Sequence, residues 1–278
     1  MRFPRAMLLV PTAFFMWACA LEERLIFYPD KTIYQTPGRA GLIFDDVYFA
    51  ARDGVRLNGW YVPYPNAQRT LLWFHGNAGN ISHRVQNIRL LHDNVRINVF
   101  IFDYRGYGRS QGKISEAGTY LDGIAAVDFL RERYQVQPQD LVMFGRSLGA
   151  AVAAEIATQV AGRALILESP FVSVAAMARE VFPLLPLGPL LSIQYNTLEK
   201  VQRVKSPILV LHGDRDEVVP FSQGRKVFAA AAEPKRFFTI RGAGHNDTYL
   251  VGGDAYFAAL REGIEWEVGR ADPRTPGE

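Results

Sequence analysis

Six short apolar runs recur along the chain after residue 69, and each is long enough for one buried strand. They cover residues 70–74, 98–102, 141–144, 164–167, 208–211 and 237–240. Runs that are apolar at successive positions, rather than at every second one, are typical of strands that are buried on both faces of a parallel sheet. We therefore predict six buried parallel strands.

Longer stretches with helical character separate most of these runs. They cover residues 81–92, 115–134, 150–160, 222–232 and 254–268. Strands that alternate with helices predict an α/β fold, with a doubly wound and mostly parallel sheet. Ligands of such sheets bind at the carboxyl ends of the strands, and the polar, glycine-rich turns of this chain follow its strands at those ends.

The region before the first parallel strand has a different pattern. Residues 46–51 and 55–62 have strand character, and the turn Arg52-Asp53-Gly54 joins them. An Asp-Gly pair between two strands is typical of an antiparallel hairpin. We expect this hairpin at the N-terminal edge of the sheet.

Length and composition fit one large domain. The chain has 278 residues, of which 49% are hydrophobic, and no repeat or change of composition marks a second domain. The formal net charge is +3 and the basic residues are scattered, so we expect no nucleic-acid partner. The single cysteine, Cys19, excludes an internal disulfide and a cysteine-based metal site.

The beginning of the chain has the pattern of a targeting or anchoring segment. Arg2 and Arg5 precede an uncharged, mostly apolar stretch over residues 6–21, and Glu22 and Glu23 follow it. This charge distribution predicts a cytoplasmic N-terminus, with the rest of the chain exported to the non-cytoplasmic side of a membrane.

Four fates of this segment are compatible with its sequence. We favour an uncleaved anchor, although sixteen residues are few for a full crossing. A lipoprotein modified at Cys19, a signal cleaved after Ala20 and an ordinary buried helix are the alternatives. The expected division of the chain is a signal or anchor segment (1–24), a folded domain (25–270) and a flexible tail (271–278).

One serine stands between two glycines, after a predicted strand and before a predicted helix. The sequence there is Gly145-Arg146-Ser147-Leu148-Gly149. G-x-S-x-G in this context is a nucleophile elbow. Such a turn holds the serine in a strained backbone conformation, and side chains at the glycine positions would clash where strand and helix pass closely. Ser147 is the candidate nucleophile, and a glycine-bracketed turn with a solvated serine is the alternative.

A serine hydroxyl needs an imidazole to remove its proton, and the imidazole needs a carboxylate to orient it. Among five histidines, His245 is the candidate base, because it lies in a glycine-rich loop after the last predicted strand. The turn after residue 211 offers the acid. Asp216 is favoured over Asp214, although their positions barely separate them, and Glu168 is a third possibility.

The other four histidines have structural explanations. We expect His75 to satisfy backbone groups of the glycine-rich turn that it opens, and His212 to pack or hydrogen-bond locally at a strand end. His83 and His92 lie on a predicted surface helix and look inert.

Acyl transfer also requires N–H donors that face the oxyanion of the tetrahedral intermediate. One donor is the residue after the nucleophile, here Leu148. The second is expected from the glycine-rich turn over residues 75–80, with Asn77 as the first choice and Ala78 close behind. A simple helix-entry turn is the alternative interpretation of this stretch.

The connection between Pro170 and the strand at 208–211 is long, and its residues 181–191 are strongly apolar. Connections of that length are usually functional or carry structure of their own. The apolar stretch is compatible with three roles: lining an acyl pocket, touching a membrane, or packing as core.

Several ordered motifs make residues 25–268 similar to a known family. They are Phe27-Tyr28-Pro29, His75-Gly76-Asn77-Ala78-Gly79-Asn80, Asp103-Tyr104-Arg105-Gly106-Tyr107-Gly108, Gly145-Arg146-Ser147-Leu148-Gly149, Glu168-Ser169-Pro170-Phe171, His212-Gly213 followed by Asp216 and Val219-Pro220, and Gly244-His245. On these motifs the chain resembles the α/β-hydrolase fold superfamily, and more closely the fungal bud-emergence (Bem-type) hydrolases and their bacterial and animal relatives. The resemblance implies a triad of Ser147, Asp216 and His245, and it selects Asp216 over Asp214. It also implies a membrane tether at the N-terminus.

These observations predict a serine hydrolase of carboxylesterase or thioesterase type that acts on a small-molecule or lipid-like acyl substrate through an acyl-enzyme. We expect this chemistry to be metal-independent. We also expect no cofactor, because neither a G-x-G-x-x-G motif after the first parallel strand nor a phosphate-binding lysine motif is present. The alternative is a membrane-tethered, non-catalytic interaction protein on a hydrolase scaffold. The oligomeric state is not predicted.

Overall fold

A single mixed sheet forms the centre of the molecule. The computed structural model describes residues 22–23, 26–185, 188 and 191–266. The strands of the main sheet are β2 (Asp45–Ala50), β3 (Arg56–Val62), β4 (Thr70–Phe74), β6 (Asn98–Asp103), β7 (Leu141–Arg146), β8 (Ala164–Glu168), β9 (Ile208–Gly213) and β10 (Lys235–Ile240). Their order is β10-β9-β8-β7-β4-β6-β3-β2, and the strands from β10 to β6 are parallel. The predicted α/β fold is confirmed.

The predicted hairpin lies at the edge of this sheet. β2 pairs with β3 antiparallel, and β3 pairs antiparallel with β6. Gly54 N donates to Ala51 O at 2.8 Å, which closes the turn between the two strands. The Asp-Gly signal therefore located the turn correctly.

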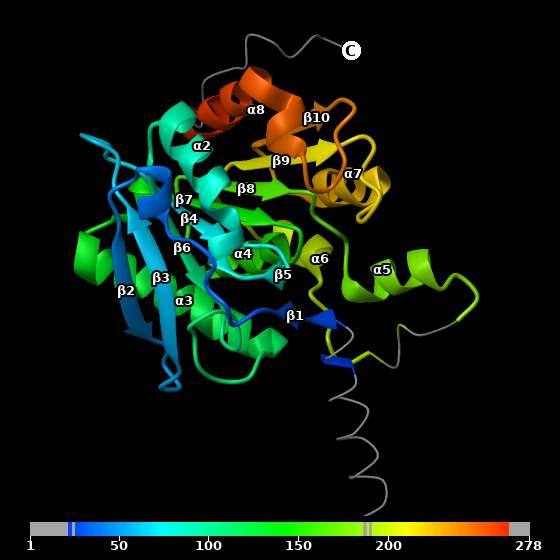
Figure 1. Ribbon diagram of the computed structural model, residues 1–278. Helices are drawn as coiled ribbons and strands as arrows, with labels where there is room; N and C mark the ends of the chain where they lie inside the picture. The colour runs from blue at the N-terminus through cyan, green and yellow to red at the C-terminus, as the bar shows by residue number, and fades with distance from the viewer. Residues whose placement is uncertain (1–21, 24–25, 186–187, 189–190, 267–278) are drawn as a thin grey trace, which may run out of the picture.

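Helices cover both faces of the sheet (Figure 1). They are α2 (Val85–Val95), α3 (Glu116–Tyr134), α4 (Leu148–Gln159), α5 (Val174–Val181), α6 (Thr197–Val201), α7 (Phe221–Ala230) and α8 (Thr248–Glu265). α2 and α8 lie against each other on one face, and α3, α4, α6 and α7 lie on the other. The last helix begins at Thr248, six residues before the predicted start, and it has a non-helical residue at Gly253.

The central strands are buried on both faces, which explains their continuous apolar runs. In β4, Leu72 and Phe74 belong to the hydrophobic cluster under α3 and α4, whereas Leu71 and Trp73 belong to the cluster under α2 and α8. Successive side chains of a strand point to opposite faces, so a strand with two apolar layers needs apolar residues at every position.

The strand order places two turns beside each other. From β4 the chain runs to β6 on one side, and it then crosses to β7 on the other side of β4. Turns that leave a sheet in opposite directions open a crevice at the carboxyl ends of the strands. The turn after β4 and the turn after β7 border this crevice.

A small second sheet covers the turn after β4. Its strands β1 (Tyr28–Pro29) and β5 (Ala78–Gly79) pair in parallel. Tyr28 N donates to Asn77 Oδ1 at 3.3 Å, and Asn77 Nδ2 donates to Ile26 O. The backbone of Ile26 and Tyr28 therefore holds the glycine-rich turn through the side chain of Asn77.

The long connection after β8 carries α5 and α6, and α5 projects from the body of the molecule (Figure 1). Four apolar residues at the end of α5 are exposed: Val181 (64%), Phe182 (50%), Leu184 (93%) and Leu185 (51%). Packing as core is therefore wrong for these four residues. Residues 186–187 and 189–190 lie outside the described part of the chain.

The predicted anchor at residues 6–21 and the predicted tail at 271–278 also lie outside the described residues. Of the helices in the described part, none has the length and apolar character needed to cross a bilayer. Glu22 is described, and its carboxylate accepts hydrogen bonds from Ser192 N at 3.1 Å and Ile193 N at 2.9 Å. These bonds join Glu22 to the residues that directly follow the apolar stretch 181–191.

Candidate active site

Ser147 lies at a sharp turn between β7 and α4. Its φ is 53° and its ψ is −118°, a region that residues with side chains rarely occupy. Such a conformation costs about 1–3 kcal/mol and persists only where the surrounding structure enforces it. Here Ser147 N donates to Glu168 O at 2.9 Å, which ties the turn to the neighbouring strand.

The two glycines of the motif are required by close backbone approach. A Cβ atom at Gly145 would lie 2.4 Å from Gly149 O, and one at Gly149 would lie 1.9 Å from Phe74 O. Both distances are far shorter than any van der Waals contact. The structure agrees with the predicted reason for the glycines.

His245 and Asp216 form a direct pair. His245 Nδ1 lies 2.8 Å from Asp216 Oδ2 and 3.0 Å from Oδ1. This contact assigns the proton to Nδ1 and leaves Nε2 as the free base. His245 and Ser147 line one pocket of about 660 Å³. No hydrogen bond joins these two side chains in the described residues, and such bonds often tighten only when a substrate is bound.

Asp216 is held as a carboxylate by its surroundings. Its Oδ1 accepts hydrogen bonds from Val218 N at 3.0 Å and Val219 N at 2.7 Å, and His212 Nε2 lies 3.4 Å from Oδ2. Burial alone would raise the pKa of Asp216, but the contacts with His212, His245 and Val219 hold that pKa well below its usual range. The sequence did not predict the contact of His212 with the acid, although an i,i+4 spacing was a possible signal.

The other two candidate acids are engaged elsewhere. Asp214 is exposed, and its Oδ1 accepts a hydrogen bond from Gly242 N at 2.6 Å. Glu168 is buried and contacts Arg146, at 3.2 Å, together with two hydroxyl groups. Asp216 is the carboxylate in contact with the imidazole of His245.

Arg146 and Glu168 form a buried pair that the sequence analysis did not recognise. The two residues are register partners in β7 and β8, and Arg146 also donates to His245 O. Glu168 accepts hydrogen bonds from Thr248 Oγ1 at 2.6 Å and Tyr256 OH at 2.5 Å. The pair therefore connects the nucleophile strand, the loop of His245 and α8.

The turn after β4 lies beside the nucleophile. A Cβ atom at Gly76 would lie 3.7 Å from Ser147 Cβ, and the next residue is Asn77. In the described part of the chain, the backbone N–H groups of Asn77 and Leu148 donate no hydrogen bond. Leu148 is the first residue of α4, where an N–H has no partner within the helix. Both donors are available to a bound group.

His75 is fully buried behind this turn. Its Nδ1 lies 2.7 Å from Gly76 O, and burial together with the charge of Arg84 lowers its pKa to about 3. The ring is neutral at physiological pH, in agreement with the expected structural role. His83, expected to be inert, accepts from Asn80 N at 3.2 Å and lines the same pocket as Ser147.

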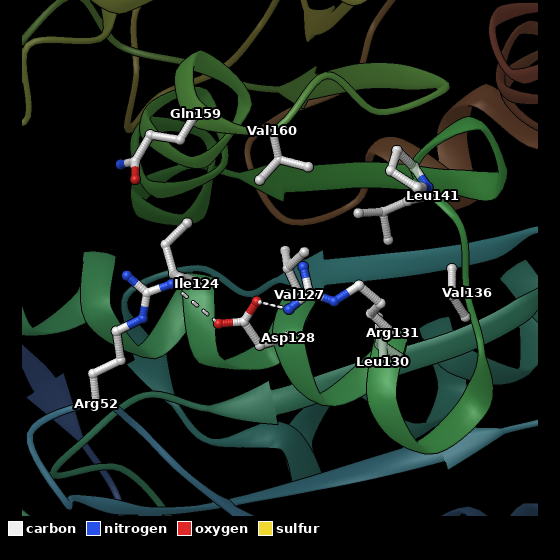
Figure 2. A pocket seen from close by; sticks show the side chains of 11 residues that line it. Arg52, Ile124, Val127, Asp128, Leu130, Arg131, Val136, Leu141, Gln159 and Val160 are labelled. Carbon is white, nitrogen blue, oxygen red and sulfur yellow. Dashed lines mark hydrogen bonds and ion pairs between the residues drawn. The ribbon is translucent and has the colours of Figure 1, made fainter.

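A smaller pocket of about 220 Å³ lies between α3 and the beginning of β7 (Figure 2). Its apolar lining includes Val127 and Leu141, and Asp128 joins Arg52 at 3.3 Å and Arg131 at 2.8 Å across it. Leu141 opens β7, whereas Ser147 follows its end, so this pocket lies at the opposite edge of the sheet. Neither Ser147 nor His245 lines this smaller pocket.

Comparisons with known proteins agree with this geometry. The family described as serine aminopeptidase, S33, matches residues 65–193. The chain is 38% identical over 255 residues to the uncharacterised protein Rv2307c of Mycobacterium tuberculosis. This alignment covers 91% of this chain and 90% of that protein. It is 34% identical over 238 residues to protein bem46 of Schizosaccharomyces pombe, and this alignment covers 82% of this chain and 78% of that protein. The esterase Pf2001 of Pyrococcus furiosus has the same fold, with a TM-score of 0.71 and 22% identity over 86% of this chain and 96% of that structure.

The sheet topology and the serine elbow define the class as α/β hydrolases. Within this class, the chain belongs to the Bem46-type family. The resemblance stated from the sequence motifs is confirmed, and the chain is identified as a hydrolase.

Proposed function

We propose that this hydrolase cleaves carboxylic esters or thioesters with Ser147 as nucleophile, His245 as general base and Asp216 as the group that orients His245. The observation that carries the proposal is the 2.8 Å contact between His245 Nδ1 and Asp216 Oδ2, next to a strained serine in one pocket. The contact keeps the proton on Nδ1 and leaves Nε2 unprotonated, as the base of a triad requires.

The reaction would proceed in two steps. His245 Nε2 takes the proton of Ser147 Oγ while Oγ forms a bond with the acyl carbon. The same proton then passes to the departing alcohol or thiol as its bond to carbon breaks. Water, activated by His245, attacks the acyl-enzyme, which releases the acid and restores Ser147. Asp216 remains ionised and stabilises the imidazolium in both steps.

The oxyanion of each tetrahedral intermediate would be bound by the backbone N–H groups of Asn77 and Leu148. Two facts support this role: the turn of Asn77 adjoins Ser147, and neither N–H has a partner in the described residues. The N-terminus of α4 adds a favourable dipole for the developing negative charge.

A fluorophosphonate probe tests the proposal directly. We expect the purified protein to be labelled covalently at Ser147, as identified by mass spectrometry of the labelled peptide. The probe reacts only with a serine that is activated by its base. A protein that stays unlabelled, and that hydrolyses neither p-nitrophenyl esters nor acyl-CoA nor aminopeptidase substrates, would instead support the non-catalytic alternative.

We also propose that the N-terminal segment tethers the hydrolase domain to the non-cytoplasmic side of a membrane. Two observations support this placement. Apolar side chains after α5 are exposed, and Glu22, next to the apolar segment, is bonded to the folded domain at residues 192 and 193. We expect the full chain to float with phospholipid vesicles in a density gradient, and a chain that begins at Glu22 to float less. If both chains stayed equally in the lipid-free fractions of the gradient, the tether would be refuted.

A further inference from the structure

The pocket of Ser147 contains an arginine that forms no ion pair within the described residues. Arg84 ends the 3-10 turn Ile81–Arg84 and lines the pocket together with Ser147 and His245. Its Nη2 donates to Ala78 O at 2.6 Å. A guanidinium has five N–H donors. In the described part of the chain, Arg84 makes no ion pair and no second hydrogen bond.

The second arginine of the pocket is neutralised within the protein. Arg146 Nε lies 3.2 Å from Glu168 Oε1, and its guanidinium also donates to the loop of His245. The charge of Arg146 is therefore engaged in structure, and Arg84 is the arginine whose charge is available to a ligand.

In the described part of the chain, neither Asp30 nor Asp103 forms an ion pair with Arg84. Asp30 lines the pocket, but its carboxylate accepts from Thr32 N at 2.8 Å and lies 3.9 Å from His83 Nε2. Asp103 is fully buried and does not line the pocket; its Oδ1 accepts a hydrogen bond from Ile81 N at 3.0 Å and lies 3.6 Å from His75 Nε2.

Arg84 is half-buried, and it shares the pocket with the positive charge of Arg146. Burial, and then the nearby charge of Arg146, lower its pKa to about 10. The guanidinium still remains charged at neutral pH. An anion that entered the pocket would replace solvation that the protein does not provide.

We propose that Arg84 binds a carboxylate or phosphate group of the substrate, so that the enzyme prefers anionic esters or thioesters. This inference rests on the proposed function and specifies its substrate class. Arginine suits such a role because its planar N–H groups match the oxygens of both anions. The volume of about 660 Å³ is large enough for a small ligand that reaches both Arg84 and Ser147.

Two pairs of esters distinguish on which side of the scissile bond the anion lies. In the first pair the acyl group differs: p-nitrophenyl hemisuccinate carries a carboxylate, and p-nitrophenyl 4-methylpentanoate has a neutral group of the same shape. In the second pair the leaving group differs: 4-(butyryloxy)benzoate is compared with 4-(butyryloxy)benzamide. In at least one pair we expect Arg84→Met to lower kcat/KM for the anionic ester about tenfold or more. The neutral partner should change less than about threefold, because it makes no charge-assisted bond.

Two further variants make the test specific. Arg84→Lys keeps a positive charge and should restore part of the preference. Arg89→Met is the matched control, since Arg89 is a surface residue of α2, 56% exposed, whose Nε lies 3.3 Å from Asp93. It should leave both members of each pair unchanged. Equal losses on anionic and neutral esters with Arg84→Met would refute the anion subsite while the hydrolase function stands. Wild-type protein that neither hydrolyses any of the four esters nor reacts with the fluorophosphonate would refute the proposed function, and the subsite with it.

Discussion

Replacement of Ser147 by alanine is expected to lower ester turnover by at least about three orders of magnitude, because no acyl-enzyme can form without the hydroxyl. Steady-state hydrolysis of p-nitrophenyl butyrate measures this loss. Covalent labelling by the fluorophosphonate should disappear at the same time. The substitution removes one oxygen from a side chain that makes no hydrogen bond in the described residues, so the fold should persist.

Ser169→Ala is a suitable control for this variant. Ser169 also has a positive φ, of 47°, and is fully buried, but it follows β8 rather than β7. Its hydroxyl lacks a hydrogen-bond partner, so its loss should leave turnover close to that of the wild type. A Ser147→Ala enzyme that keeps a tenth or more of wild-type turnover would refute the assignment of the nucleophile.

Asp216→Asn is expected to lower kcat by about 10³–10⁴-fold, because an amide cannot stabilise the imidazolium and favours the wrong tautomer of His245. The asparagine Oδ1 can still accept from the N–H groups of Val218 and Val219, so the turn should be preserved. Circular dichroism and the midpoint of urea unfolding check that the fold is retained.

Asp214→Asn is the matched control, two positions away in the same turn. Its carboxylate contacts Gly242 N and not the imidazole, so we expect less than about a threefold change in kcat. A larger loss with Asp214→Asn than with Asp216→Asn would reverse the assignment of the acid.

Periodicity predicted the main sheet well because it depends on burial. Each central strand has apolar layers on both sides, and this requirement appears in the sequence as a continuous apolar run. The end of the chain was predicted less well. The last helix starts at Thr248, soon after His245, and its non-helical residue Gly253 is the reason that the regular pattern appeared to begin only at residue 254.

The candidate site could be predicted in part because its members belong to local motifs. Ser147 stands in an elbow whose glycines are required because an added Cβ atom would lie 2.4 or 1.9 Å from backbone oxygens, and such a requirement is visible in a five-residue pattern. Asp216 and Asp214 could not be separated in this way. They share one turn, and only the direction of each side chain decides which of them meets His245.

The sequence by itself determined the alternation of strands and helices, the elbow at Ser147 and a short list of residues for its chemistry, because each of these depends on neighbours along the chain. The tertiary structure alone decided which residues meet. The order of the strands places β8 beside β7, so that Glu168 lies opposite Arg146, and the guanidinium of Arg146 donates to His245 O. The same order opens the crevice beside β4, where Arg84 joins Ser147 in one pocket. Contacts of this kind depend on the packing of distant segments, and no local pattern of residues encodes them.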